Sequence, residues 1–178
     1  MEFVFLAPFF SLMATGCLAQ FAPLNARVIL AGRSTVSGIL NLTESAQLGG
    51  VRITGRVTGL TPGNHGFHVH EFGDVFTKGC DSTGPHFDTK IVFHGAPEDE
   101  ISQRHAGDLG NIEANSRGIA IVNIVDRVIS LSGPSSILGR AFIIHAGEDD
   151  LGRGNNEGST KTGNAGARLA CGIVALVP

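Results

Sequence analysis

Residues 51–58 read Val-Arg-Ile-Thr-Gly-Arg-Val-Thr. A small or apolar residue occupies every odd-numbered position of this stretch, and arginine or threonine occupies every even-numbered one. A period of two places these sets on opposite faces of a β-strand, so one face is buried and the other meets solvent. The stretch therefore predicts a strand of an antiparallel sheet with one solvated face.

Seven further stretches on either side have the apolar or alternating character of strands. They are Arg27–Ala31, Val36–Leu42, Gly66–Phe72, Asp108–Glu113, Ile119–Val125, Arg140–Ala146 and Leu169–Val177. Glycine-rich turns separate several of them, as at residues 59–63, and no helical stretch of useful length is present. Eight short strands with such turns predict an all-β fold, an eight-stranded antiparallel sandwich or barrel.

The composition agrees with this fold class and excludes several others. The chain has 178 residues, which suits one domain, and 25 of them are glycine. That much glycine without a three-residue period excludes collagen and disfavours long helices, where each glycine costs about 1 kcal/mol. A net charge of −3 offers no basic surface, so binding to nucleic acid is not expected.

The N-terminal stretch Met1–Leu18 is almost entirely apolar. It suits a secretory signal better than a spanning helix, which needs roughly 20 apolar residues. Small residues at Cys17 and Ala19 predict cleavage after Ala19, giving a signal peptide at residues 1–19 and a secreted, extracellular domain at residues 20–178 that is free of the membrane. Because no basic residue precedes the apolar run, an uncleaved membrane anchor and a lipoprotein signal ending at Cys17 are the alternatives.

Cleavage at this point removes one of the three cysteines and leaves Cys80 and Cys171. In an oxidising compartment the two are expected to form a disulfide, which would contribute about 4–5 kcal/mol by closing a long loop. Two buried thiols are the alternative. The sequence Asn41-Leu42-Thr43 makes Asn41 a candidate N-glycosylation site, although such triplets also occur by chance.

The seven histidines carry the strongest chemical signal. His68 and His70 are two positions apart on a predicted strand, so both imidazoles project from one face about 7 Å apart, as two ligands of one metal would. Two paired or exposed histidines are the alternative. His145 ends another predicted strand. Further candidates lie in or beside the irregular stretch 73–107: His86, His94, His105 and Asp108. This concentration predicts a metal site.

Five segments resemble the copper/zinc superoxide dismutase family. They are residues 66–73 (GFHVHEFG), 84–87 (GPHF), 105–110 (HAGDLG), 139–140 (GR) and 161–172 (KTGNAGARLACG). The resemblance runs from about Arg27 to Val177. It implies a Greek-key barrel of eight antiparallel strands with the architecture of an immunoglobulin-like sandwich. It also implies a long loop that bears metal ligands and the disulfide, and a second, electrostatic loop.

The resemblance implies a ligand set for each of two ions. The copper ligands would be His68, His70, His86 and His145. The zinc ligands would be His86, His94, His105 and Asp108, so that the ring of His86 bridges the two ions. Four imidazoles suit a redox-active copper, and three imidazoles with one carboxylate suit a closed zinc site. Asp149 resembles a carboxylate that joins a copper-side to a zinc-side imidazole, and His65 a histidine that packs beneath the site.

The activity that the resemblance implies is dismutation of superoxide to O2 and H2O2, with copper reduced and oxidised in turn, as an antioxidant defence outside the cell. Arg168 resembles the arginine that guides superoxide to the copper. His86 resembles the imidazole that also donates a proton. Lys161, with Glu157 nearby, would shape the electric field over the channel.

The chain departs from the family pattern in three places. Gly158 stands where many members have a second acidic residue, the loop at residues 95–104 is two residues longer than usual, and the stretch before Cys80 is one residue longer and contains Phe76. The apolar tail at residues 173–177 resembles a dimer strand, so a homodimer is expected. The alternatives are a copper-chaperone-like member and a non-catalytic extracellular copper- or zinc-binding protein, and the complete ligand set favours the enzyme.

Overall fold

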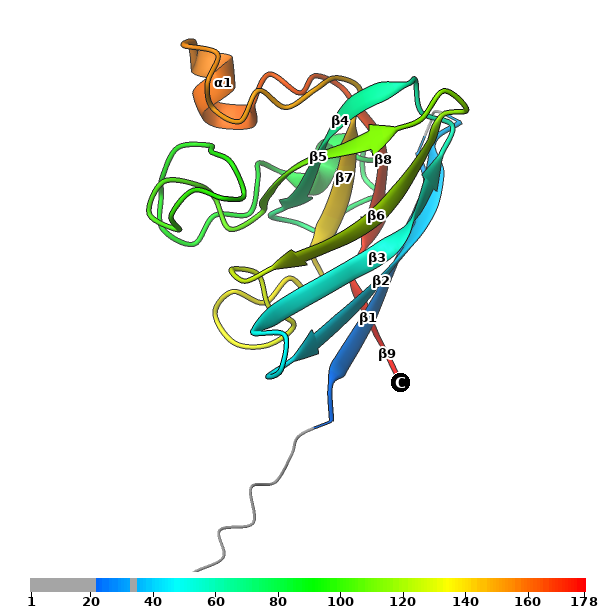
Figure 1. The fold of residues 1–178 in the computed structure, drawn as a ribbon, viewed down its shortest axis with the longest axis vertical. Coiled ribbons are helices and arrows are strands. Elements are labelled where there is room, and N and C mark those ends of the chain that lie inside the picture. The colour runs from blue at the N-terminus through cyan, green and yellow to red at the C-terminus, as the bar shows by residue number, and fades with distance from the viewer. Residues whose placement is uncertain (1–21, 33–34) are drawn as a thin grey trace, which may run out of the picture.

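The computed structural model describes residues 22–32 and 35–178, and the expected signal peptide at residues 1–19 lies outside them. Nine antiparallel strands form one sheet in the order β8-β7-β4-β5-β6-β3-β2-β1-β9, which curls into a nearly closed barrel (Figure 1). The strands are β1 (Leu24–Leu30), β2 (Ser37–Ser45), β3 (Gly50–Thr58), β4 (Gly63–His70), β5 (Asp108–Ala114), β6 (Ile119–Asp126), β7 (Ala141–His145), β8 (Arg168–Ile173) and β9 (Ala175–Val177). The antiparallel all-β barrel is therefore confirmed.

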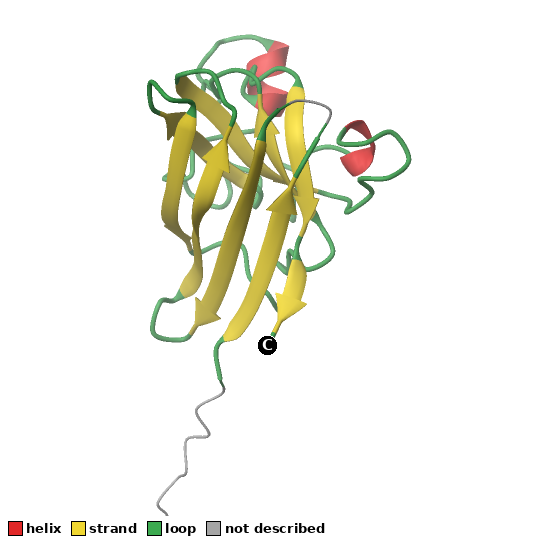
Figure 2. Cartoon of the chain, turned by 90° about the vertical axis from the view of Figure 1, so that its right-hand side faces the viewer, coloured by secondary structure: helices red, strands yellow, loops and turns green. Residues whose placement is uncertain are grey.

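The alternating stretch forms β3, which pairs with β2 on one side and β6 on the other. Val51, Ile53 and Val57 are completely buried in the core, whereas Arg52 and Arg56 are exposed. The long strands β1, β2 and β3 form one wall of the barrel, with few loops over their outer face (Figure 2). The period of two in the sequence thus predicted both the strand and the face that it buries.

The last predicted strand is divided in two by Val174. In β8, Cys171 exchanges two backbone hydrogen bonds with Ala31, at N–O distances of 2.9 and 3.0 Å, and this bridge joins the edge strand β8 to the residue that follows β1. Val174 then pairs with the turn before β7, accepting from Gly139 N and donating to Arg140 O. β9 resumes alongside β1. The prediction of eight strands was therefore one strand too few.

A six-residue helix, α1 (Glu157–Thr162), stands above the barrel at the end that carries β4 and β5 (Figure 1). Asn156 caps its N-terminus by accepting a hydrogen bond from Ser159 N, and Gly163 ends it in the left-handed conformation. The sequence predicted no helix, because six residues are too few to display a period of 3.6. Within the described residues, no helix is long and apolar enough to cross a membrane.

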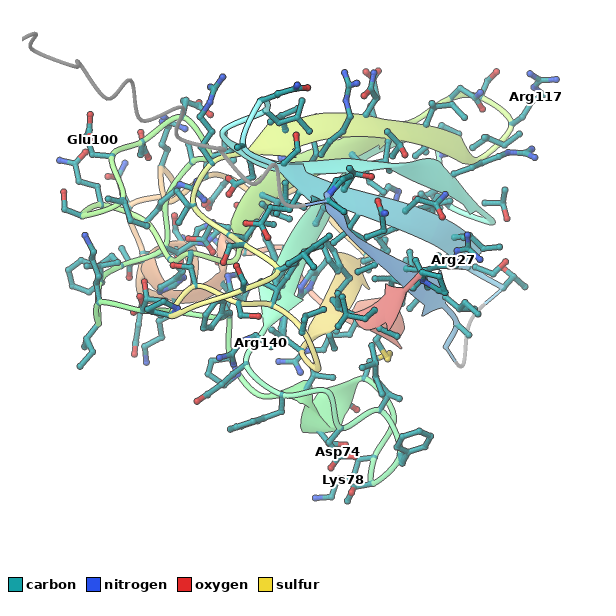
Figure 3. The ribbon with its side chains drawn as sticks, turned by 90° about the horizontal axis from the view of Figure 1, so that it is seen from below. Arg27, Asp74, Lys78, Glu100, Arg117 and Arg140 are labelled. Carbon is teal, nitrogen blue, oxygen red and sulfur yellow. A yellow bond between two sulfur atoms is a disulfide. The ribbon has the colours of Figure 1, made fainter. Side chains whose placement is uncertain are left out.

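Two long loops, one between β4 and β5 and one between β7 and β8, lie over the outer face of β4. Since the barrel core buries Phe67 and Val69 on the inner face, every residue from His65 to His70 is buried. The first follows β4 and contains a single 3-10 turn, η1 (Asp81–Thr83). Part of it, bearing Asp74 and Lys78, projects from the barrel (Figure 3). The disulfide between Cys80 and Cys171, 91 positions apart, ties this loop to β8 and confirms the expected pairing.

Candidate metal centre

Four histidines converge on one point at the outer face of β4 and β7. His68 and His70 come from β4, with ring centroids 6.5 Å apart, and His145 ends β7 beside them. His86 comes from the loop after η1, where its backbone forms an isolated bridge with His70. One ring nitrogen from each of the four lies within 4.8 Å of the others. The structure therefore brings together all four histidines expected around copper.

The nitrogens that face this point have no hydrogen-bond partner among the described residues. They are His68 Nδ1 and the Nε2 atoms of His70, His86 and His145, and all four are buried. Each opposite nitrogen meets an acceptor: His68 Nε2 donates to Asp149 Oδ2 at 2.8 Å, and the Nδ1 atoms of His70 and His145 donate to backbone carbonyls at 2.8 and 3.0 Å. The acceptors fix the tautomers, so the lone pairs point at a common centre. Four inward lone pairs fit a copper ion.

A second donor group lies on the other side of the His86 ring. Asp108, at the start of β5, presents Oδ1 to three imidazole nitrogens: His86 Nδ1 at 2.7 Å, His94 Nδ1 at 3.0 Å and His105 Nδ1 at 3.1 Å. Its Oδ2 accepts from the backbone nitrogens of Gly95 and His105, which fixes the carboxylate. The four donor atoms lie within 4.8 Å of one another and fit a closed, four-coordinate zinc site.

His86 is the one residue that belongs to both groups. Its Nε2 faces the first group and its Nδ1 the second, and its ring lies 4.0 Å from that of His68. A single imidazole with both nitrogens directed at donor clusters can bridge two metal ions. This arrangement matches the bridging position expected for His86.

Asp149 connects the two groups from outside. Its Oδ2 accepts from His68 Nε2 and its Oδ1 accepts from His94 Nε2 at 2.7 Å. The carboxylate is buried, and Asn111 on β5 holds its backbone with hydrogen bonds of 2.8 and 2.9 Å. A carboxylate that accepts from one imidazole of each group sets the orientation of both rings. Asn111 was not singled out in the sequence, because its partner is 38 positions away.

Burial and hydrogen bonding shift the pKa values of the copper-side histidines and of His94 in opposite directions. Burial lowers the pKa of His68, His70 and His86, and it lowers the pKa of His145 to about 4. Burial also acts on His94, but hydrogen bonds to Asp108 and Asp149 outweigh it and raise its pKa to about 9. The imidazoles of the first group are therefore neutral near pH 7, the state in which they bind metal.

Burial alone would raise the pKa of Asp108. Hydrogen bonds from His105, His86 and His94 outweigh that effect and hold the pKa well below its ordinary range. Asp108 therefore remains a carboxylate throughout the neutral range. An anionic oxygen surrounded by three imidazoles is a donor set for a divalent cation.

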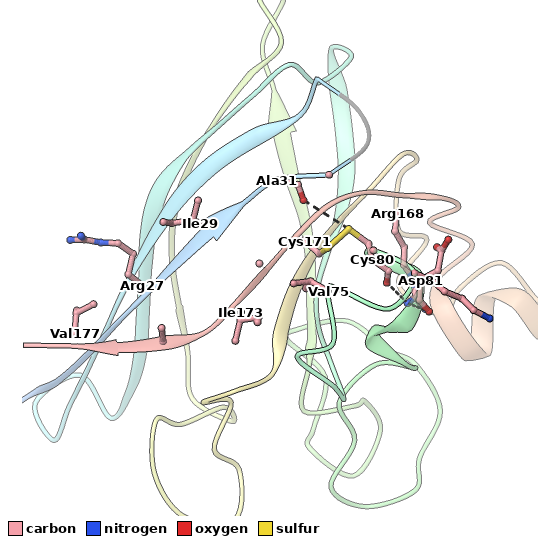
Figure 4. A pocket seen from close by; sticks show the side chains of 15 residues that line it. Arg27, Ile29, Ala31, Val75, Cys80, Asp81, Arg168, Cys171, Ile173 and Val177 are labelled. Atoms are coloured by element: carbon pink, nitrogen blue, oxygen red, sulfur yellow. Dashed lines mark hydrogen bonds between the residues drawn. A yellow bond between two sulfur atoms is a disulfide. The ribbon is translucent and has the colours of Figure 1, made fainter.

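Arg168, the first residue of β8, lies beside the first group. Its Nη2 donates to Gly84 O at 2.7 Å, and the same carbonyl accepts from His70 Nδ1. Its Nη1 donates to Cys80 O at 2.9 Å, so the guanidinium rests against the backbone of the disulfide (Figure 4). After burial, the Arg168 charge is one further cause of the lowered pKa of His70 and His145. A half-buried cation is thus held next to the four inward nitrogens.

His65 is the one histidine outside both groups. Its Nδ1 bonds to His145 O at 2.8 Å, and its Nε2 meets the carbonyl and hydroxyl oxygens of Thr61 at 2.9 and 3.2 Å. Both ring nitrogens are occupied by these contacts. The placement agrees with the packing position predicted for it.

An ion pair that the sequence did not suggest supports the second group. Arg104 is almost completely buried and donates to Asp126 Oδ2 at 2.7 Å and to Asp108 O at 2.8 Å. It therefore links the end of β6 to the loop between His94 and Asp108. The sequence indicated only that a charged residue, Asp126, follows the apolar stretch Ile119–Val125. It did not indicate that Arg104 is the partner of Asp126.

Three other candidate residues lie on the surface. Lys161 and Glu157 pair across α1, with Nζ 2.6 Å from Oε1, and both are exposed. The helix rests on the second group, since Thr160 O accepts from His94 N at 2.8 Å. Asn41 is exposed on β2 and accepts a hydrogen bond from Arg27 Nε at 3.0 Å, so the two side chains lie together on the outer face of the sheet.

Compared with known families, the chain matches the family described as Copper/zinc superoxide dismutase (SODC) over residues 36–174. The matched span begins just before β2 and ends just after β8. It includes both donor groups, Asp149, Arg168 and the two disulfide cysteines. The family suggested by the five sequence segments is therefore the family that the comparison identifies.

Replacing Gly163 should disrupt the link between the two groups. A Cβ at Gly163 would overlap Asp149 Oδ1 and lie 2.6 Å from His94 Nε2. We expect Gly163→Ala to weaken zinc binding, measured by chelator competition, by at least about tenfold, the lower range for a displaced outer ligand partner. Gly49→Ala is the matched control, because Gly49 has a similar φ of 62° but no atom near the added methyl. Equal effects of the two changes would contradict the role given to Asp149.

The metal-free protein should lose stability as the pH falls from about 6.5 to 4. In this window the unfolded chain takes up a proton at residue 145, whereas folded His145, with a pKa of about 4, does not. The free energy of unfolding therefore decreases as the pH is lowered, and the contribution of His145 to this decrease is roughly 3 kcal/mol between pH 6.5 and pH 4. Denaturant unfolding of wild type and His145→Gln would measure it, with a shallower dependence in the variant. Equal slopes for the two proteins would refute the assignment.

Proposed function

Since the chain belongs to the copper/zinc superoxide dismutase family, we propose that it binds one copper and one zinc ion per subunit and dismutates superoxide: 2 O2•− + 2 H+ → O2 + H2O2. The observation that carries the proposal is the ring of His86, which presents one nitrogen to each of two complete donor groups. Two buried, adjacent and differently composed donor groups suit two ions with different tasks.

The ligand assignment follows from the donor atoms. His68 Nδ1 and the Nε2 atoms of His70, His86 and His145 would hold copper. The Nδ1 atoms of His86, His94 and His105, with Asp108 Oδ1, would hold zinc. When bound, copper supplies a redox centre that accepts an electron from one superoxide and returns an electron to the next.

The chain's own residues attract and orient the substrate. Superoxide is a small anion, and Arg168 presents a positive charge beside His70 and His145. Two of its five N–H donors, one on Nη2 and that on Nε, make no hydrogen bond to any residue of the described chain, so they are available to an anion. Lys161 and Glu157 are exposed on α1 and shape the field over the approach.

The protons come from solvent, and His86 is placed to deliver one of them. Its Nδ1 is fixed toward Asp108, whereas its Nε2 faces His68, His70 and His145 with no hydrogen-bond partner in the described chain. When Nε2 does not bind copper, a proton held on this nitrogen would lie beside the other three copper-side nitrogens. The remaining proton comes from solvent water.

We further propose that the mature protein is extracellular, begins after a signal peptide at residues 1–19 and is glycosylated at Asn41. Exposure of Asn41 on β2 supports modification, because the side chain can reach solvent. The disulfide supports an oxidising compartment.

The same protein is proposed to form a homodimer through an apolar groove of about 650 Å³ beside the disulfide (Figure 4). Ile29, Val75, Ile173 and Val177 line this groove, and the neighbouring Phe76 is 84% exposed. A second copy would cover these apolar side chains.

A copper-chaperone-like or non-catalytic metal-binding role is the weaker candidate. Such a protein needs neither a complete second donor group nor an arginine fixed beside the first. This chain has both, with Arg168 held by four acceptors on residues 80–84. The enzyme is therefore favoured.

Superoxide consumption by the purified protein loaded with copper and zinc tests the activity. We expect rapid consumption by wild type, and a rate at least about tenfold lower for His145→Ala, because one of four copper donors is removed. Wild type loaded with zinc alone is the control and should be inactive. A His145→Ala variant as fast as wild type would contradict the copper site.

Expression with the native N-terminus in a secreting eukaryotic cell tests the extracellular assignment. The protein recovered from the medium should begin at Gln20, lose mass on glycosidase treatment and sediment as a dimer. Asn41→Gln should abolish the mass loss without changing the N-terminus. Retention inside the cell with an intact Met1 would refute secretion, and a monomer in the medium would refute the dimer alone.

A further inference from the structure

Thr83, the last residue of η1, lies beside Arg168, and neither the family resemblance nor the ligand sets assign it to the site. Its side chain is completely buried, although threonine carries a hydroxyl that must be paired. The hydroxyl oxygen lies 2.9 Å from Cys80 O and 3.0 Å from Arg168 Nη1. A buried hydroxyl is thus placed between the disulfide loop and the guanidinium.

The direction of both hydrogen bonds is fixed by chemistry. A guanidinium has only donors, so Thr83 Oγ1 must accept from Arg168 Nη1. The single hydroxyl proton is then available for Cys80 O, which is an acceptor only. Nη1 has two hydrogens. Its two short contacts are with Cys80 O and Thr83 Oγ1, and Asp81 O lies farther away at 3.4 Å. Thr83 therefore completes the bonding of Nη1 and fixes the plane of the guanidinium.

The plane of the guanidinium matters because its other terminal nitrogen, Nη2, contacts the copper side of the site. Nη2 donates to Gly84 O, the carbonyl that also accepts from the copper-side residue His70. A rotation of the guanidinium would break this shared contact and redirect the two remaining donors. Valine at position 83 would have nearly the same shape but could neither accept from Nη1 nor donate to Cys80 O.

We propose that Thr83 is a positioning residue, which orients Arg168 toward the anion beside the copper ligands. It touches neither substrate nor metal and acts through the arginine. The proposal rests on the proposed function for its catalytic consequence. The geometric consequence, a guanidinium held by the hydroxyl, concerns the metal-free chain as well and can be measured separately.

The first experiment measures how accessible Arg168 is in the metal-free protein. Phenylglyoxal modifies free guanidinium groups, and peptide mass spectrometry gives the rate at each arginine. We expect Thr83→Val to raise the rate at Arg168 by about threefold or more, the effect of losing one hydrogen bond, and Thr83→Ser to match wild type. Thr58→Val is the matched control, because the Thr58 hydroxyl also donates to a backbone carbonyl, that of Ser37. Thr58 lies on β3, in a part of the chain that contributes nothing to the site.

Labelling of buried Arg104 reports unfolding in the same sample, and Thr83→Ala provides a second variant without the hydroxyl. Unchanged labelling of Arg168 in Thr83→Val would overturn the proposal, as would Thr83→Ser behaving like Thr83→Val. If both the valine and alanine variants unfold, shown by labelling of Arg104, Thr83 is needed for folding and the positioning role is rejected.

The second experiment titrates the copper- and zinc-loaded protein with azide, a small anion, and follows its visible spectrum. Thr83→Val should raise the azide Kd roughly three- to tenfold, and Thr83→Ser should restore it. An unchanged Kd would overturn the role in anion binding. If wild type binds azide but consumes no superoxide, the proposed function fails, while the labelling result still decides the role of Thr83.

Discussion

Four imidazole nitrogens lie buried at the outer face of β4 and β7 without a partner in the described chain, and an unsatisfied buried polar atom costs about 1–3 kcal/mol. Ordinary packing does not tolerate such a cluster. It persists here because every opposite ring nitrogen is fixed by a carbonyl or carboxylate, as in the pair formed by His68 and Asp149. The two loops and the disulfide maintain this arrangement, and metal binding would satisfy the four nitrogens.

The barrel and the loops divide the task between them. The C-terminal half of β4, Phe67–His70, pairs with β7 and sets the spacing of His68, His70 and His145. The loop between β4 and β5 contributes His86 and His94. The Cys80–Cys171 disulfide, worth about 4–5 kcal/mol in the chain-entropy model, fixes the first loop to β8, and Arg168 is held by the same segment. Loss of that constraint would therefore affect ligand placement and substrate orientation together.

Much of the fold could be predicted from local pattern. The alternation in residues 51–58 located β3 and its buried face, because the strand period is visible in eight residues. β4 begins three residues earlier and ends two residues earlier than predicted, since Glu71 N and Phe72 N pair with the loop at Pro85 and Thr83. The break at Val174 and the helix α1 depend on partners or lengths that leave no periodic signal.

The candidate site, like the fold, could be predicted from the sequence only in part. The spacing of His68 and His70 indicated a metal site, but the grouping of the remaining ligands required the family resemblance. Arg104, Asn111 and Thr83 were missed because each acts through a partner 22, 38 or 85 positions away. No pattern within one segment of sequence reports such contacts. They are visible only once the loops are folded over β4.

The central claim is that His86 joins two different metal ions through its two ring nitrogens. A crystal structure of the copper- and zinc-loaded protein, with anomalous diffraction recorded at both metal edges, tests it most directly. We expect copper bound by His68 Nδ1 and the Nε2 atoms of His70, His86 and His145, with zinc beside His86 Nδ1. A single ion, or two ions that do not share His86, would contradict it.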